Sequence, residues 1–254
     1  MDFKFGYETY QDVRKNLFYY SIPILNIAGF FLFFGIIPPK HQTVITSLIE
    51  YLSSFALLKP LLGCAIFTII SLLLTETFQV HDRWYDRFVI KWRFRYATDF
   101  ILPRLIHPLA SKINYRFHME AEKHIKEFQE SLYYPFVGDR DGKIGKNLLV
   151  KFYERITIYW LTQIIEIVIL ICLLTAILYF IFYPADPTYI QSLANSFCIL
   201  IIAFILNRIW AKGSLKSVRE ATENEIRAIH EKHLVELDAN LKNLCQDFSI
   251  PYAQ

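Results

Sequence analysis

The chain has little cysteine, and no motif uses it. Its 254 residues include four cysteines, none of them in a Cys-x-x-Cys pair. Cys64, Cys172 and Cys198 fall within apolar runs, whereas disulfide frameworks and zinc sites need partners at characteristic spacings. The sequence therefore predicts neither disulfides nor a metal site, and we expect no cofactor.

The chain also lacks the common motifs of catalysis. It contains no nucleophile elbow, no dinucleotide fingerprint and no phosphate loop. The segment "VGDRDGKIGK" (137–146) has three glycines at the wrong spacing for a phosphate loop, and we expect it to be a connecting loop. Arg227 and His233 have the loose Arg-x-x-x-x-x-His spacing of HEPN ribonucleases, but any helix containing both residue types can match by chance. We expect that the protein is not an enzyme.

Charge is scarce and unevenly distributed. Only 20% of the residues are charged and 54% are apolar, and the charges avoid four stretches of the chain. These stretches are 17–37, 60–80, 160–183 and 189–210. Each supplies the ~20 residues that a helix needs to cross a ~30 Å hydrocarbon core. A chain of this length is unlikely to bury four such helices as a soluble domain, so the sequence predicts four transmembrane helices.

The cations predict the orientation of these helices. Every Lys and Arg except Lys40 and Lys59 lies before the first stretch, between the second and third, or from Arg208, at the end of the fourth stretch, onward. Arg208 is counted with the cytoplasmic charges that follow the fourth span. Because cytoplasmic segments carry the excess of Lys and Arg, we expect both termini and the middle segment to be cytoplasmic. The polar N-terminus "MDFKFGYETYQDVRKN" predicts no cleaved signal peptide.

The predicted fold is an all-α membrane protein with two transmembrane hairpins and a helical cytoplasmic module. Its predicted parts are a cytoplasmic N-terminus (1–16), hairpin 1 (17–80), a helical cytoplasmic segment (81–156), hairpin 2 (157–211) and a cytoplasmic C-terminal helix (212–254).

Two of these parts have their own patterns. Residues 110–134 are predicted to be helical, with one apolar stripe, and Ser214 is predicted to cap the C-terminal helix. The stripe consists of Phe117, Ala121, Ile125, Phe128 and Leu132. In the tail, Leu234, Leu237, Leu241, Leu244 and Phe248 follow the spacing of a coiled-coil seam. That seam serves either self-association or packing on the chain's own middle segment.

The stretch "HDRWYDRFVIKWRFRYATDF" (81–100) alternates rings and cations. Aromatic and cationic residues each recur every four positions, which makes adjoining stripes on one helix. Pro103 is predicted to end this helix. One interpretation is a membrane-surface helix whose cations reach lipid phosphates. Another is an anion-binding site in which rings stack on bases and guanidinium groups pair with phosphates. A third is packing against other helices. The candidate ligand-binding residues are Arg83, Trp84, Arg87, Lys91, Trp92, Arg93 and Arg95.

Few polar residues fall inside the predicted spans. Glu166 lies one or two turns from the cytoplasmic end of the third span, with Gln163 one turn away. A carboxylate at this depth normally faces protein or water. Glu166 either pairs with a nearby cation such as Arg155 or joins a ring that lines a path for cations. The candidate pore-lining residues are Gln163, Glu166, Asn195 and Asn207.

Two transmembrane hairpins around a basic helical module, with residues 81–104 as the most distinctive stretch, resemble the four-helix membrane effectors of bacterial antiphage defence, such as the Hailong-type channel effector. This resemblance implies a channel in a bacterial inner membrane that opens when a nucleotide or oligonucleotide messenger binds on the cytoplasmic side. Because one four-helix unit with mostly apolar spans encloses little water, a pore needs several copies, and we expect a closed homo-oligomer, with a tetramer favoured. A partner nucleotidyltransferase would make the messenger, and opening would depolarise the membrane and arrest growth. The alternative is a non-conducting sensor or scaffold that docks a cytoplasmic partner.

Overall fold

The computed structural model is helical throughout its described residues, which are 7–38, 41–43, 47, 68–77, 95–138, 142–182 and 187–253. Within these ranges there is no strand. Three helices are long and apolar enough to cross a membrane: Tyr10–Ile36, Lys146–Phe182 and Tyr189–Asp247. They include the first, third and fourth predicted spans. The second predicted span (60–80) lies mostly outside the described residues, which include only 68–77 of it.

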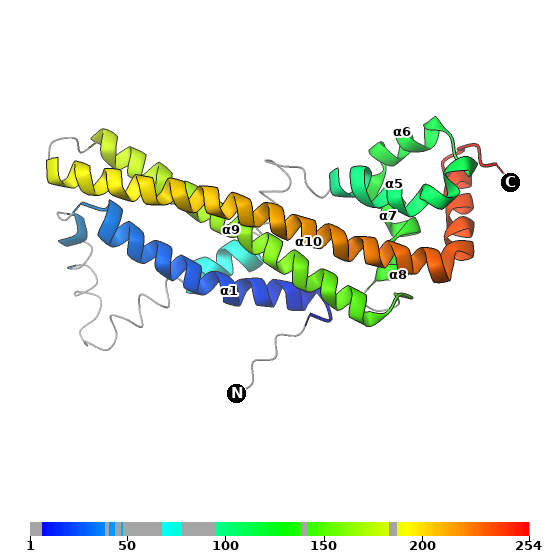
Figure 1. The fold of residues 1–254 in the computed structure, drawn as a ribbon, viewed down its shortest axis with the longest axis horizontal. Coiled ribbons are helices and arrows are strands. Elements are labelled where there is room, and N and C mark those ends of the chain that lie inside the picture. Colours follow the sequence, from blue (N-terminus) through cyan, green and yellow to red (C-terminus); the bar gives the residue numbers. More distant parts are fainter. Residues whose placement is uncertain are drawn as a thin grey trace. The chain divides into compact units, whose positions relative to one another are not determined.

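The chain divides into two compact units. Unit 1 consists of Met1–Val13, Tyr85–Ile156 and Leu215–Gln254, and unit 2 of Arg14–Trp84 and Thr157–Ser214. The helices α9 (Lys146–Phe182) and α10 (Pro187–Asp247) contribute residues to both units (Figure 1).

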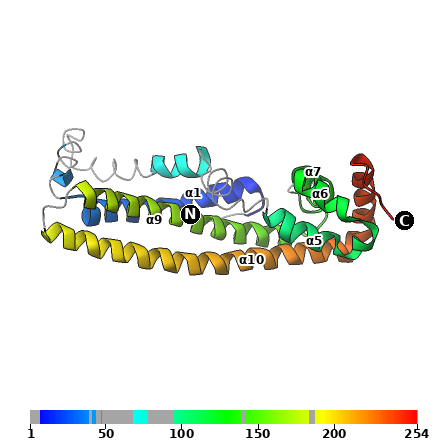
Figure 2. The same ribbon diagram turned by 90° about the horizontal axis from the view of Figure 1, so that it is seen from above.

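In unit 2, α1 (Tyr10–Phe31) and the π-helical η1 (Leu32–Ile36) lie beside α10 (Figure 2). The Ser196 hydroxyl donates to the Gly35 carbonyl oxygen at 2.9 Å, and a Cβ on Gly35 would stand 3.0 Å from the Ser196 oxygen. Glycine therefore permits this close approach. The Tyr189 hydroxyl donates to the Ile36 carbonyl oxygen at 2.7 Å. These bonds fix one end of α1 against the start of α10.

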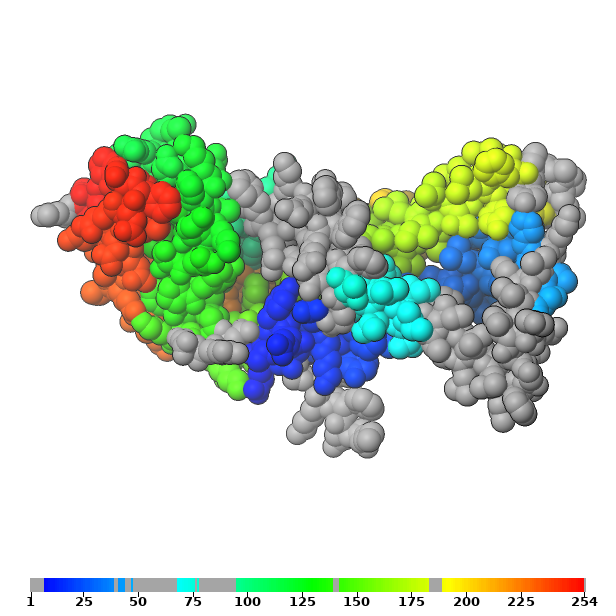
Figure 3. Space-filling view, turned by 180° about the vertical axis from the view of Figure 1, so that it is seen from behind, coloured from blue at the N-terminus to red at the C-terminus, as the bar shows by residue number. Residues whose placement is uncertain are grey.

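A second contact joins α1 to the helical residues 68–77, which include η2 (Leu73–Thr77). The hydroxyls of Ser21 and Ser71 are hydrogen-bonded, and both side chains are fully buried. Figure 3 shows the η2 residues, in cyan, against the blue residues of α1. Small polar residues allow helices to approach closely and to hydrogen-bond across an apolar interface. Large apolar side chains elsewhere on α1, α9 and α10 remain exposed, as expected of helices that contact lipid.

Unit 1 contains several short helices, together with the start of α9 and the end of α10. The short helices are η4 (Ala97–Ile101), α5 (Leu102–Ile106), η5 (His107–Lys112), α6 (Tyr115–Lys123), α7 (Ile125–Leu132) and α8 (Tyr134–Val137). Its core contains the fully buried rings of Phe117, Phe128 and Phe136, together with Leu237 and Leu241 of α10. The predicted apolar stripe therefore does form a core, although Ile125 is only partly buried.

Two predicted helix boundaries are wrong. The helix does not end before Pro103, because α5 follows η4 directly and includes this proline in its first turn. The Leu102 N–H donates to the Ala97 carbonyl oxygen in a π-helical turn. This π-helical turn is wider than an α-helical turn. It therefore leaves room for the ring of Pro103, whose nitrogen has no hydrogen to donate.

The segment 110–134 is helical over most of its length, as predicted, but it is divided among several helices, and α6 and α7 break at His124, whose φ and ψ are −121° and 37°. The second error concerns Ser214. Ser214 does not cap a separate helix, since it lies inside α10. α10 instead bends at His233, whose φ and ψ of −132° and 19° are not helical.

The leucines of the predicted seam face the chain's own unit 1. Leu237, Leu241 and Leu244 are buried, and the Phe248 ring lies 5.2 Å from the Phe128 ring between centroids. In this structure the seam therefore packs on the middle segment, which was one of the two alternatives for it. Beyond it, the Ala253 N–H donates to the Lys112 carbonyl oxygen at 2.9 Å, which fixes the end of the chain to η5.

Candidate functional site

Most of the predicted ligand-binding stretch lies outside the described residues. Arg95 is the only described member of the predicted set, and its side chain is exposed. Arg83, Trp84, Arg87, Lys91, Trp92 and Arg93 all fall within 78–94, where the structure gives no description.

Phe100, the last residue of this stretch, belongs to an arginine–phenylalanine cluster, which we define as Phe100, Arg104 and Arg219. The Arg104 guanidinium carbon lies 3.9 Å from the centroid of the Phe100 ring, and that of Arg219 lies 5.4 Å from the same centroid. Tyr96 stacks on Phe100 with 5.0 Å between centroids. Arg104 also pairs with Glu223 at 3.3 Å.

The cluster resembles the pattern predicted for 81–100, because a ring holds guanidinium groups through cation–π contacts. Arg219 comes from α10, more than one hundred residues away, so the sequence stretch alone could not indicate it. Two guanidinium groups at one ring are suited to pairing with an anion such as a phosphate.

A second group of polar side chains lies between α9 and α10 in unit 2. We call Thr162, Gln163, Glu166, Asn207 and Arg208 the hairpin polar cluster. The Asn207 side-chain N–H donates to the Thr162 carbonyl oxygen at 3.0 Å. Arg208 donates to both Glu166 carboxylate oxygens, at 3.1 and 3.2 Å. Glu166 is buried, whereas the Arg208 side chain is 47% exposed.

Two amide oxygens in the hairpin polar cluster lack partners. Gln163 Oε1 and Asn207 Oδ1 are buried and accept no hydrogen bond from the residues that the structure describes. Their residues are only 3% and 4% exposed. A buried polar atom without a partner costs roughly 1–3 kcal/mol. Water, a cation or a donor from another chain would remove this cost.

The structure brings together three of the four predicted pore-lining residues. Gln163, Glu166 and Asn207 are buried in the hairpin polar cluster, while Asn195 is exposed on α10. Glu166 pairs with Arg208 rather than with Arg155, the nearby cation that was named as an example from the sequence.

The sequence did not indicate Thr162 or Arg208 as site residues. Arg208 was counted as a cytoplasmic charge at the end of a span. The hairpin carries part of the signal, because residues equally far from its turn lie opposite one another. Thr162 and Asn207 satisfy this condition, whereas Arg208 lies about one helical turn farther from the hairpin turn than Glu166 does.

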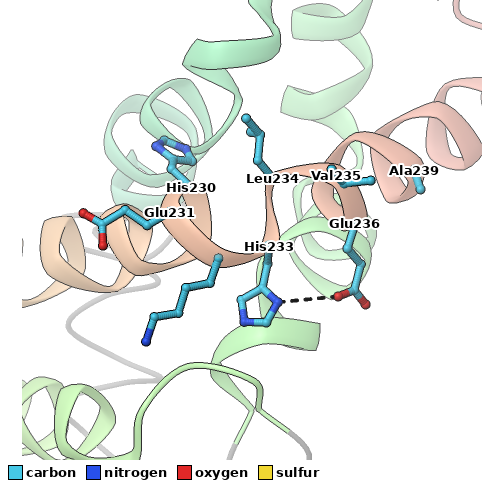
Figure 4. Close-up of a pocket in the computed structure, with 8 residues that line it drawn as sticks. His230, Glu231, His233, Leu234, Val235, Glu236 and Ala239 are labelled. Carbon is cyan, nitrogen blue, oxygen red and sulfur yellow. Dashed lines mark ion pairs between the residues drawn. The ribbon is translucent and has the colours of Figure 1, made fainter.

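A hollow lies at the bend of α10, with a volume of about 410 Å³ (Figure 4). Its lining includes His230 and His233. His230 Nε2 donates to the Leu105 carbonyl oxygen at 2.8 Å, and His233 Nδ1 lies 3.7 Å from a Glu236 carboxylate oxygen. Both histidines thus have contacts within unit 1. Within the described ranges no group of three or more His, Cys, Asp or Glu residues is placed to hold a metal ion.

Comparison with known proteins places the chain in a family. No curated protein and no solved structure matches the chain. The sequence profile of the YmfE protein family matches residues 21–241, a range that runs from within α1 to near the end of α10. Because this match covers far more than half of the sequence, the chain belongs to the YmfE protein family.

Proposed function

We propose that this chain is a membrane protein with four spans. They are the three long apolar helices and the second predicted span (60–80). Both termini and the basic middle segment lie in the cytoplasm, and the membrane is the bacterial inner membrane. The distribution of Lys and Arg supports this orientation, since only Lys40 and Lys59 lie in the predicted outer segments.

We propose further that several copies form an ion channel. The observation that carries this proposal is the hairpin polar cluster, which buries Gln163, Glu166 and Asn207 between two otherwise apolar helices. Polar groups at this depth are costly and commonly mark paths for ions. One chain encloses little water, so conduction requires a closed homo-oligomer, and we favour a tetramer.

The proposed channel opens when an anionic ligand binds in the cytoplasm. The ligand is a nucleotide or short oligonucleotide, bound by the stretch 83–95 and the arginine–phenylalanine cluster. Its phosphates pair with guanidinium groups, and its bases stack on rings. α9 and α10 contribute to both units and provide a physical connection between ligand and pore. In this proposal the protein is an antiphage effector that depolarises the membrane and arrests growth, with a nucleotidyltransferase as the source of the ligand.

One observation favours a second function. Arg208 neutralises Glu166 within the same chain, which removes the free carboxylate that a cation path would use. A non-conducting scaffold, which docks a cytoplasmic partner through unit 1, fits this pairing without further rearrangement.

Flux measurements distinguish the two functions. The protein is reconstituted in vesicles that hold a potassium-sensitive dye, and short single-stranded DNA oligonucleotides or ATP are added. We expect one probe to raise the flux, and we expect Arg104→Lys with Arg219→Lys to abolish the response, since lysine cannot pair bidentately with phosphate. Arg116→Lys, on the exposed face of α6, is the matched control. No flux with either probe, together with a monomer in native mass spectrometry, would favour the scaffold.

A labelling experiment tests the orientation. Single cysteines are introduced at Gly145, Lys40 and Asp186 in a chain whose native cysteines are replaced, and a membrane-impermeant maleimide is added to intact cells. Gly145 is exposed, and a Cβ there would meet no atom within 4 Å. We expect labelling at positions 40 and 186 and none at 145 until the cells are lysed. Labelling of position 145 in intact cells would reverse the orientation.

A further inference from the structure

The only carboxyl group that α10 buries within unit 1 belongs to Glu225, among the residues that the structure describes. Glu225 is 1% exposed. Its Oε2 accepts a hydrogen bond from the Tyr133 hydroxyl at 2.5 Å. Its Oε1 is buried and has no hydrogen-bond partner within the described ranges. Glu225 forms no ion pair with the residues that the structure describes, although exposed carboxylates of the same helix do form such pairs.

A second buried polar pair lies one turn away. The hydroxyls of Tyr96 and Thr222 are hydrogen-bonded at 2.7 Å, and Thr222 lies three residues before Glu225. Together the two pairs connect α10 to the start of η4 and to the junction between α7 and α8, where Tyr133 lies. Hydrogen bonds of buried side chains therefore join α10 to both of these parts of unit 1.

Among the residues that the structure describes, the groups that act on Glu225 or respond to it are tyrosines. Tyr133 faces it from the α7–α8 junction, with Tyr134 beside that ring, and Tyr96 faces it from the start of η4. On α10, Arg219 and Glu223 act electrostatically on Tyr96. Arg219 lies against Phe100 and Glu223 pairs with Arg104, so both have other contacts.

We propose that Glu225 is a proton-controlled switch in unit 1. The carboxyl group binds a proton when α10 is packed against Tyr133, and loss of that proton loosens this packing. The reason is that an ionised carboxylate needs several donors when buried, and Glu225 has one. This inference concerns the stability of unit 1 and does not depend on channel activity.

The direction of titration agrees with the geometry. Burial raises the pKa of Glu225 to about 8, although the Tyr133 hydroxyl lowers it in part. An unfolded Glu has a pKa of about 4.3, so between these values the packed state holds a proton that the unfolded state has lost. The contribution of Glu225 to the stability of unit 1 is therefore fully present below about pH 4.3. This contribution declines as the pH rises and is lost above about pH 8.

Thermal unfolding of the full chain in mild detergent tests the switch. Between about pH 6 and pH 9 we expect the wild-type melting temperature to fall by roughly 5 °C more than that of Glu225→Gln. Glutamine has nearly the same shape and cannot ionise. Glu231→Gln, an exposed carboxylate on the same helix, is the matched control and should keep the wild-type profile.

Infrared difference spectroscopy gives a second measurement that does not depend on stability. The wild type should show the carbonyl band of a protonated carboxylic acid near neutral pH, and this band should disappear with a midpoint near pH 8 and be missing from Glu225→Gln. Tyr133→Phe should move the midpoint to higher pH, since it removes the one donor to the ionised form. Identical pH profiles for wild type and Glu225→Gln, or the same acid band in both proteins, would overturn the proposal.

Discussion

Replacing Arg208 by alanine is expected to lower the free energy of unfolding by about 3 kcal/mol, because it leaves the Glu166 carboxylate buried without its cation. The Glu166 side chain is 7% exposed and receives two hydrogen bonds from Arg208. Glu166→Gln should cost much less, about 1 kcal/mol, since the half-exposed Arg208 can then turn to water. Denaturant unfolding in mild detergent measures both values.

A double-mutant cycle separates this pair from the other contacts of Arg208. The double variant Glu166→Gln with Arg208→Ala should be more stable than Arg208→Ala alone, because it no longer contains an unpaired buried carboxylate. Equal costs for the two single variants would show that the pair is not buried in the assembled protein. Such a result would favour an arrangement in which Glu166 faces water.

The second large effect is expected at Phe128, in the core of unit 1. Its side chain is fully buried, and its ring lies 5.1 Å from that of Phe117 and 5.2 Å from that of Phe248 between centroids. Phe128→Ala should cost about 3–5 kcal/mol, since it removes a large apolar group and leaves a cavity. Limited proteolysis should then cleave unit 1 at protease concentrations that the wild type resists.

Two controls define the cause of this effect. Phe128→Leu keeps an apolar side chain of similar volume and should cost less than about 1.5 kcal/mol. Phe30→Ala should cost little in detergent, because Phe30 is 66% exposed and in our proposal contacts lipid. If Phe128→Ala resists protease as the wild type does, the packing of α7 against the end of α10 is not required for a stable unit 1.

Long apolar runs and helical stripes could be predicted from the sequence because both depend on the order of nearby residues. Three of the four predicted spans coincide with long apolar helices, and Phe117 and Phe128 lie in the core as their spacing indicates. The boundaries were less predictable. Pro103 is accommodated by a π-helical turn, and Ser214 stays within α10 although it resembles a cap. Tertiary packing overrides these local preferences.

The amino-acid sequence by itself determined the class of this protein, the position of its apolar helices and the segregation of its charge. It also indicated Gln163, Glu166 and Asn207 as polar residues within apolar helices. Only the tertiary structure decided that Arg208 pairs with Glu166, that Arg219 joins Phe100, and that Glu225 meets Tyr133. The physical reason is distance along the chain. Each of these contacts joins residues 42 to 119 positions apart, and no period of 3.6 residues can indicate which distant side chain will lie opposite.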